Sequence, residues 1–130
     1  MHRGDDDGFD LDNGFRGLTQ FLVVAQRPSG STSDSFTMEI DSNGNEDAVP
    51  RSNVRLANFT FIQTTPSAPA AIRLRGGADF AFINGVVKSA AGQACINIVA
   101  GAGETGAGVS GSSAGTMVAT TGAAAEVGAG

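Results

Sequence analysis

Two kinds of short apolar segment alternate along this chain. Four segments alternate apolar and polar side chains, at residues 9–12, 38–41, 72–75 and 96–98. Between them lie three longer and more continuously apolar segments, at residues 18–25, 54–62 and 80–87. Alternation with a period of two predicts β-strands, and apolar segments of this length are typical of buried strands. The sequence therefore predicts an all-β fold in which two kinds of strand alternate along the chain.

The regular order of the two strand types is an internal repeat. From Leu11, equivalent positions follow at Ile40, Leu74 and Ile98, with separations of 29, 34 and 24 residues. Solenoids whose loops vary in length have such uneven periods. In a stacked solenoid, equivalent strands lie about 4.8 Å apart and fill one column of the core. We therefore predict a right-handed parallel β-helix of about three coils over residues 1–99, with an antiparallel β-sandwich as the alternative.

Residues 100–130 differ in composition from the rest of the chain. Gly and Ala dominate this segment, with scattered Ser and Thr and few large apolar side chains. Such a segment buries too little apolar surface to offset the entropy lost on ordering it. We expect a disordered tail, or narrow extra coils stacked loosely on the preceding ones.

The charge balance excludes several classes of function. The chain has 13 acidic and 8 basic residues, and ten of the acidic residues lie among residues 1–50. Because no Lys/Arg cluster is present, nucleic acid is not an expected partner. A single Cys95 and a single His2 exclude a disulfide framework and an ordinary zinc site. No segment has the apolar length of a membrane span or the apolar core of a signal peptide.

Stacking of the alternating strands predicts columns of charged side chains. Outward-facing positions in successive strands hold Asp10 and Asp12, then Glu39 and Asp41, then Arg73 and Arg75. Glu39 is expected near Arg73, and Asp41 near Arg75. Exposed ion pairs of this kind contribute at most about 1 kcal/mol each. Between the first two strands, however, like charges face one another.

Repulsion among these acids is relieved either by solvent and salt or by a hard cation. Ca²⁺ takes six to eight oxygen ligands, so a calcium site would have to be built between coils. No segment has the ligand spacing of an EF-hand loop. The sequence suggests no cofactor other than calcium. The candidate calcium ligands are Asp5, Asp6, Asp7, Asp10, Asp12, Glu39 and Asp41.

Carboxylates beside arginines on such a face also suit an enzyme that cleaves polysaccharides. Arg73 and Arg75 are then candidate ligand-binding residues for an acidic polysaccharide. No spacing of residues identifies a proton donor or a nucleophile. We therefore assign no catalytic residue.

Three groups of motifs resemble segments of large bacterial secreted and outer-surface parallel β-helix proteins. They are residues 1–10 with Gly14 to Gly17, residues 48–53 leading into Asn58 to Thr60, and residues 72–77. The resemblance covers residues 1–99. Members of that group are lipoproteins or secreted proteins of unassigned activity, with a signal peptide and further coils upstream. The resemblance implies a fragment of such a protein, extracellular or on the outer surface, whose uncapped solenoid ends promote self-association.

The residues and the resemblance together predict a structural or ligand-binding β-helix segment without chemistry of its own. One alternative is a carbohydrate-active β-helix enzyme similar to a polysaccharide lyase or hydrolase. The other is an adhesin-like module stabilised by calcium. Fold alone does not distinguish them, because solenoids support all three functions.

Overall fold

The computed structural model describes residues 6–28, 32, 34–41, 48–75, 78–98 and 118–119. All regular secondary structure in these ranges is β-strand, which confirms the predicted fold class. Among these residues, no helix is long and apolar enough to cross a membrane. The strands are β1 (Asp10–Leu11), β2 (Arg16–Gln20), β3 (Val23–Ala25), β4 (Met38–Ile40), β5 (Ser52–Ile62), β6 (Ala70–Leu74), β7 (Ala78–Lys88), β8 (Ala94–Ile98) and β9 (Val118–Ala119).

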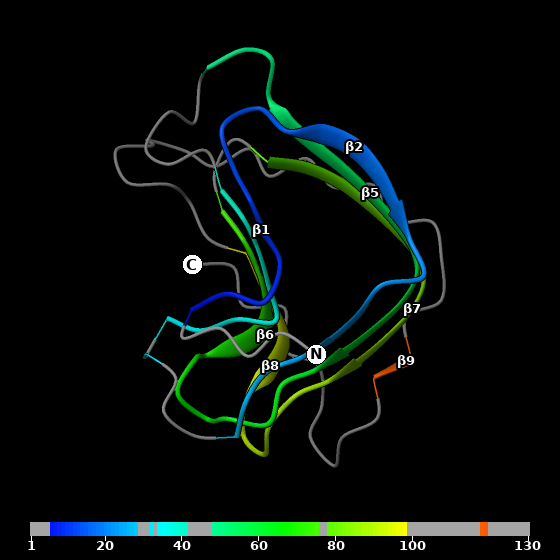
Figure 1. Cartoon of the computed structure of the whole chain (residues 1–130). Helices are drawn as coiled ribbons and strands as arrows, with labels where there is room; N and C mark the ends of the chain where they lie inside the picture. The colour runs from blue at the N-terminus through cyan, green and yellow to red at the C-terminus, as the bar shows by residue number, and fades with distance from the viewer. Residues whose placement is uncertain are drawn as a thin grey trace.

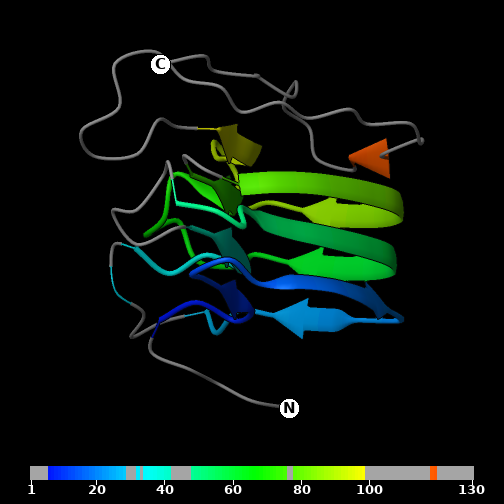
Figure 2. The same cartoon turned by 90° about the horizontal axis from the view of Figure 1, so that it is seen from above.

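The strands form two sheets. Sheet A has the order β1-β4-β6-β8, and sheet B has the order β2-β5-β7-β9, with β3 also paired to β5. Every observed pair is parallel. Figure 1 shows the two sheets on opposite sides of the interior, and Figure 2 shows their strands stacked in chain order. Parallel pairing between strands one repeat apart is the arrangement of a β-helix, so the antiparallel sandwich is wrong.

The register of sheet A is the predicted one. Asp10 pairs with Glu39, Glu39 with Arg73, and Arg73 with Asn97. A slip of one residue would move every core side chain of a strand to the surface, so the alternation of apolar residues specifies this register. The neighbouring apolar column consists of Leu11, Ile40, Leu74 and Ile98.

Side chains from both sheets meet in one apolar core. Met38 and Ile40 of β4 and Leu56 of β5 lie in this core and are at most 1% exposed. The ring centroid of Phe59 lies 4.9 Å from that of Phe61 and 5.7 Å from that of Phe82. Tilted and edge-on aromatic pairs of this kind add to the stability that apolar burial supplies.

Sheet B bends at one place in every repeat (Figure 1). Phe21, Asn58 and Asn84 hold equivalent positions there, with φ values of +57°, +54° and +54°. Asn tolerates this left-handed conformation better than most residues, whereas Phe rarely adopts it. The predicted strand 18–25 is divided at Phe21 into β2 and β3, whereas β5 and β7 continue through the equivalent positions. Just beyond the bend, the Phe59 ring fills the space that a Cβ atom on Gly85 would need, with ring atoms 2.0 to 2.5 Å from that position.

The predicted tail, residues 100–130, lies outside the described residues except for β9. Val86 and Val87 of β7 pair with Val118 and Ala119 of β9. The division of the chain at residue 99 therefore stays a prediction.

Candidate functional site

Three carboxyl groups gather where the chain enters sheet A. Asp7 precedes β1, Asp10 lies in β1 and Glu39 in β4, and one carboxyl oxygen of each lies within 4.8 Å of the others. Strand pairing brings Asp10 opposite Glu39. Asp7 joins them because the Phe36 N–H donates a hydrogen bond of 2.7 Å to Asp7 Oδ1. A second hydrogen bond, of 3.0 Å from the N–H of Gly8 to the carbonyl of Phe36, also holds the segment around Asp7 beside Phe36.

Burial and crowding make negative charge unfavourable in this group. Burial, together with a hydrogen bond to Glu39, raises the pKa of Asp7 from 3.8 to about 8. Burial also raises the pKa of Glu39, against the opposing effects of Asp7 and Arg73. Asp10 is exposed as a residue, yet partial burial of its carboxyl group, with Asp12 nearby, raises its pKa as well. At neutral pH, Asp7 and Glu39 therefore share a proton.

Arg73 and Arg75 are engaged by acids of the same sheet. Arg73 Nη1 lies 2.6 Å from Asp34 Oδ1, and Arg73 Nε lies 3.5 Å from Glu39 Oε1. Arg75 Nη1 lies 3.3 Å from Asp41 Oδ2. Both predicted ion pairs between neighbouring strands are therefore present. These contacts engage both guanidinium groups with acids of the same sheet, and the binding of a ligand by Arg73 and Arg75 stays a prediction.

The expectation that this column faces solvent is wrong for two of its acids. The side chains of Glu39 and Asp41 are only 12% and 13% exposed. Glu39 is covered because Asp7 and Arg73 both contact it, and the Arg73 guanidinium in turn lies 5.2 Å from the centroid of the Phe36 ring. Glu39 Oε1 is buried without a hydrogen bond, and Arg73 Nε lies 3.5 Å from it.

The structure brings together three of the seven candidate calcium ligands. Asp12 Oδ1 instead accepts a hydrogen bond of 3.0 Å from the N–H of Asn13, and Asp41 pairs with Arg75. Asp6 is exposed, and its carbonyl accepts a bond from Gln26. Asp5 lies outside the described residues.

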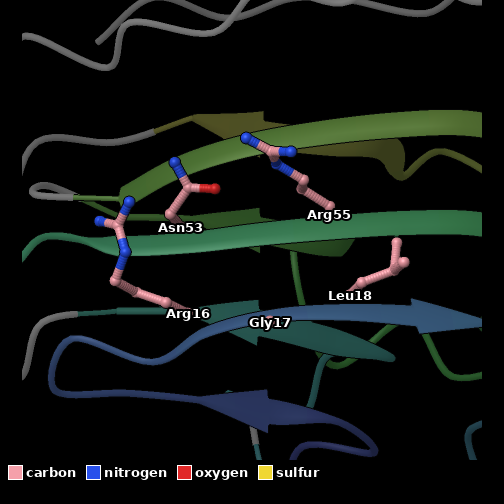
Figure 3. A pocket seen from close by; sticks show the side chains of 5 residues that line it. All are labelled: Arg16, Gly17, Leu18, Asn53 and Arg55. Atoms are coloured by element: carbon pink, nitrogen blue, oxygen red, sulfur yellow. The ribbon is translucent and has the colours of Figure 1, made fainter.

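A second site, which the sequence reasoning missed, lies on the outer face of sheet B. An open pocket of about 270 Å³ is lined by Arg16, Gly17 and Leu18 of β2 and by Asn53 and Arg55 of β5 (Figure 3). Arg16 pairs with Asn53, and Leu18 pairs with Arg55. The signal in the sequence was the pair of arginines at the starts of two equivalent apolar segments.

The pocket carries positive charge in a chain whose net charge is −5. Within the described part of the chain, Arg55 forms no hydrogen bond or ion pair. Arg16 Nη1 donates to the carbonyl of Arg51 at 3.1 Å. The acid nearest in register, Asp79 opposite Asn53, is engaged by Arg51 Nε at 3.5 Å. Among the residues that the structure describes, no carboxylate forms an ion pair with either arginine of the pocket.

Two parallel sheets, stacked in register with a shared core, define a β-helix domain. The chain matches the pectate-lyase-like beta helix domain family over residues 1–125, and it belongs to this family. Comparison with curated proteins and with solved structures gives no match. The predicted relationship to β-helix proteins is thereby confirmed, whereas the secreted or lipoprotein character stays a prediction.

Proposed function

We propose that this chain is a non-catalytic segment of a bacterial secreted or surface protein, a right-handed solenoid of about three coils that binds carbohydrate. The observation that carries the proposal is the open pocket on the outer face of sheet B. Membership of a pectate-lyase-like family supports carbohydrate as the kind of ligand. The charged groups of sheet A support a structural role for that face, because they pair with one another.

The residues of the pocket support binding rather than chemistry. Its lining consists of two arginines, an asparagine, a glycine and a leucine. Proton transfer in glycoside hydrolysis is performed by carboxyl groups, and covalent catalysis needs an activated nucleophile. None of the five lining side chains supplies either group. The alternative of a carbohydrate-active enzyme is therefore the weaker one at this site.

A glycan array combined with a turnover assay tests the proposal. We expect the intact chain to retain one class of glycan, with neither new reducing ends nor unsaturated products after prolonged incubation. Release of either product would establish the enzyme alternative. Failure to retain any glycan at millimolar concentration would overturn the carbohydrate-binding function.

The cluster of three carboxyl groups from Asp7, Asp10 and Glu39 favours a calcium-stabilised module as a second candidate function. These residues offer three of the six to eight oxygens that Ca²⁺ requires, so water or neighbouring oxygens would have to supply the rest. Because the pKa of Asp7 is raised to about 8, calcium has to displace a proton at neutral pH.

Thermal melting with and without 5 mM CaCl₂ tests this second function. We expect a rise in Tm that is larger at pH 8.5 than at pH 7, and a loss of that rise in Asp7→Asn. A ligand at a hundredfold excess over its Kd stabilises the folded state by about 2.7 kcal/mol. The same Tm with and without calcium at both pH values would exclude a calcium site here.

The resemblance to surface proteins adds a proposal about assembly. β1 and β2 are the end strands of the two sheets. Unpaired strand edges promote association with another chain. Light scattering as a function of concentration tests this, since a monomer at all concentrations would contradict it.

A further inference from the structure

We propose that the outer face of sheet B docks on an anionic lipid surface. The inference goes beyond the proposed carbohydrate binding and does not depend on it, because Phe21, Val23 and Lys88 lie outside the pocket. A contact of this kind is peripheral, since apolar side chains enter the headgroup region of a bilayer while the fold stays on its surface.

Phe21 is unusual in both its exposure and its backbone conformation. Its side chain is 77% exposed, although a large apolar side chain gains free energy by leaving water. Its φ of +57° is unfavourable for Phe, whereas the equivalent positions hold Asn58 and Asn84. Within the isolated chain, a Phe at this position therefore lowers stability in two ways. Strain of this kind at an exposed residue indicates a contact with a partner outside the chain.

Other exposed apolar side chains surround Phe21 on the outer face of the sheet. Leu18 and Val23, which precede and follow it in the chain, are 66% and 69% exposed. Strand pairing places Val23 opposite Thr60, and Thr60 opposite Val86, which is also exposed. Single exposed apolar residues are ordinary on a protein surface, whereas a group of them marks an interaction site.

Positive charge lies at both ends of this apolar group. The strands of sheet B contain three cations and one acid. Arg16 and Arg55 lie at one end, beside Leu18 (Figure 3), and Lys88 lies at the other, where β7 ends. The acid, Asp79, forms an ion pair with Arg51. This face is therefore positive in a chain whose net charge is −5, and an anionic surface complements it.

The shape of the face favours a lipid surface over a second copy of the chain. Figure 1 shows sheet B curving around the interior, so that its outer face is convex at the bend where Phe21 lies. Two convex faces of this kind contact each other over little area, and their arginines repel one another. A bilayer adapts to a convex face, because its phosphates can meet the cations while its acyl chains meet the apolar side chains.

Co-sedimentation of the intact chain with lipid vesicles tests this docking. One set of vesicles contains equal amounts of phosphatidylglycerol and phosphatidylcholine, and the other contains phosphatidylcholine alone. Phe21→Asn removes the ring in a variant that we expect to fold at least as well as the parent. Arg55→Gln and Lys88→Gln each remove one cation from the face. Circular dichroism confirms that each variant is folded.

Two further variants are matched controls. Val49→Asn removes an apolar side chain that is 85% exposed but lies outside the strands, before β5. Asp12→Asn raises the net charge by as much as Arg55→Gln lowers it, and its position follows β1 of sheet A.

We expect the parent to bind the anionic vesicles and not the neutral ones, and added NaCl to weaken this binding. Phe21→Asn should weaken it about tenfold or more, because the ring no longer leaves water on docking. Each of the two cation variants should weaken it about fivefold. Val49→Asn and Asp12→Asn should bind as the parent does.

Four outcomes would overturn the proposal. The first is no binding of the folded parent to anionic vesicles at low salt. The second is equal losses in Phe21→Asn and Val49→Asn, which would indicate nonspecific apolar adsorption. The third is a gain in Asp12→Asn as large as the loss in Arg55→Gln, which would indicate attraction by net charge alone. The fourth is binding to immobilised polyglutamate, lost in Phe21→Asn, without binding to vesicles, which would identify an acidic polypeptide as the partner.

Discussion

Asp7 makes the stability of this domain depend on pH in a direction unusual for an acid. Its pKa is 3.8 in an unconstrained chain and about 8 in the folded protein. Between these values the folded state holds a proton that the unfolded state has released. The free energy of unfolding therefore decreases as pH rises, with a limiting slope of about 1.4 kcal/mol per pH unit. The stabilisation is complete below pH 3.8 and lost as pH passes through 8.

The size of the effect is limited because Asp7 is only half-buried. Solvent screening reduces the loss between pH 5 and 8 to about 1–3 kcal/mol. Asp7→Asn should abolish most of the dependence. Its amide oxygen can still accept the Phe36 N–H and its amide nitrogen can donate to Glu39, but it does not titrate.

Urea unfolding of the parent and of Asp7→Asn at pH 5, 6, 7 and 8 measures this directly. The parent should lose stability across the series, and the variant should be nearly flat and more stable at pH 8. Asp12→Asn is a suitable control, since it removes a carboxyl group from the same face outside the shared pair. A parent whose stability is constant or rises over this range would refute the reasoning, as would a variant with the same slope as the parent.

Three further substitutions test the packing, each by its change in Tm and in the free energy of unfolding. Gly85→Ala should destabilise the fold by about 1–3 kcal/mol, because the Phe59 ring would have to move; an unchanged Tm would contradict this contact. Arg73→Met should cost about 1–3 kcal/mol by leaving the buried Glu39 without its cation, and a neutral effect would mean that Glu39 is uncharged in the parent. Phe21→Asn should stabilise by about 1 kcal/mol, because Asn tolerates φ of +57° as Asn58 and Asn84 do; destabilisation would show that the Phe ring has a compensating contact.

The strands of sheet A were predictable from the sequence because strict alternation specifies which side chains face the core. That pattern alone gives the register that pairs Asp10 with Glu39 and Glu39 with Arg73. The burial of Glu39 was not predictable in this way. It depends on the approach of Asp7, which a backbone hydrogen bond from Phe36 directs across a loop rather than along a strand.

The pocket on sheet B was missed for a different reason. Its arginines, Arg16 and Arg55, belong to strands whose outward side chains do not share one character, as Arg16, Leu18 and Gln20 of β2 show. Without a regular alternation of apolar and polar residues, the sequence does not say which side chains point outward. The bend at Phe21 adds a second uncertainty, since a left-handed Phe has no sequence signature and reverses the facing of residues beyond it.

The stacked register is maintained although the spacing of equivalent residues in sheet A varies by ten residues, from 24 to 34. Peptides grafted at the exposed turn of Ala91 and Gly92, between β7 and β8, would therefore be displayed at the surface without altering the ladder of paired strands. If one repeat of the solenoid were duplicated several times, copies of a grafted peptide would follow one another at the spacing of the strands, about 4.8 Å per layer. Vaccine and biosensor scaffolds need that kind of regular spacing.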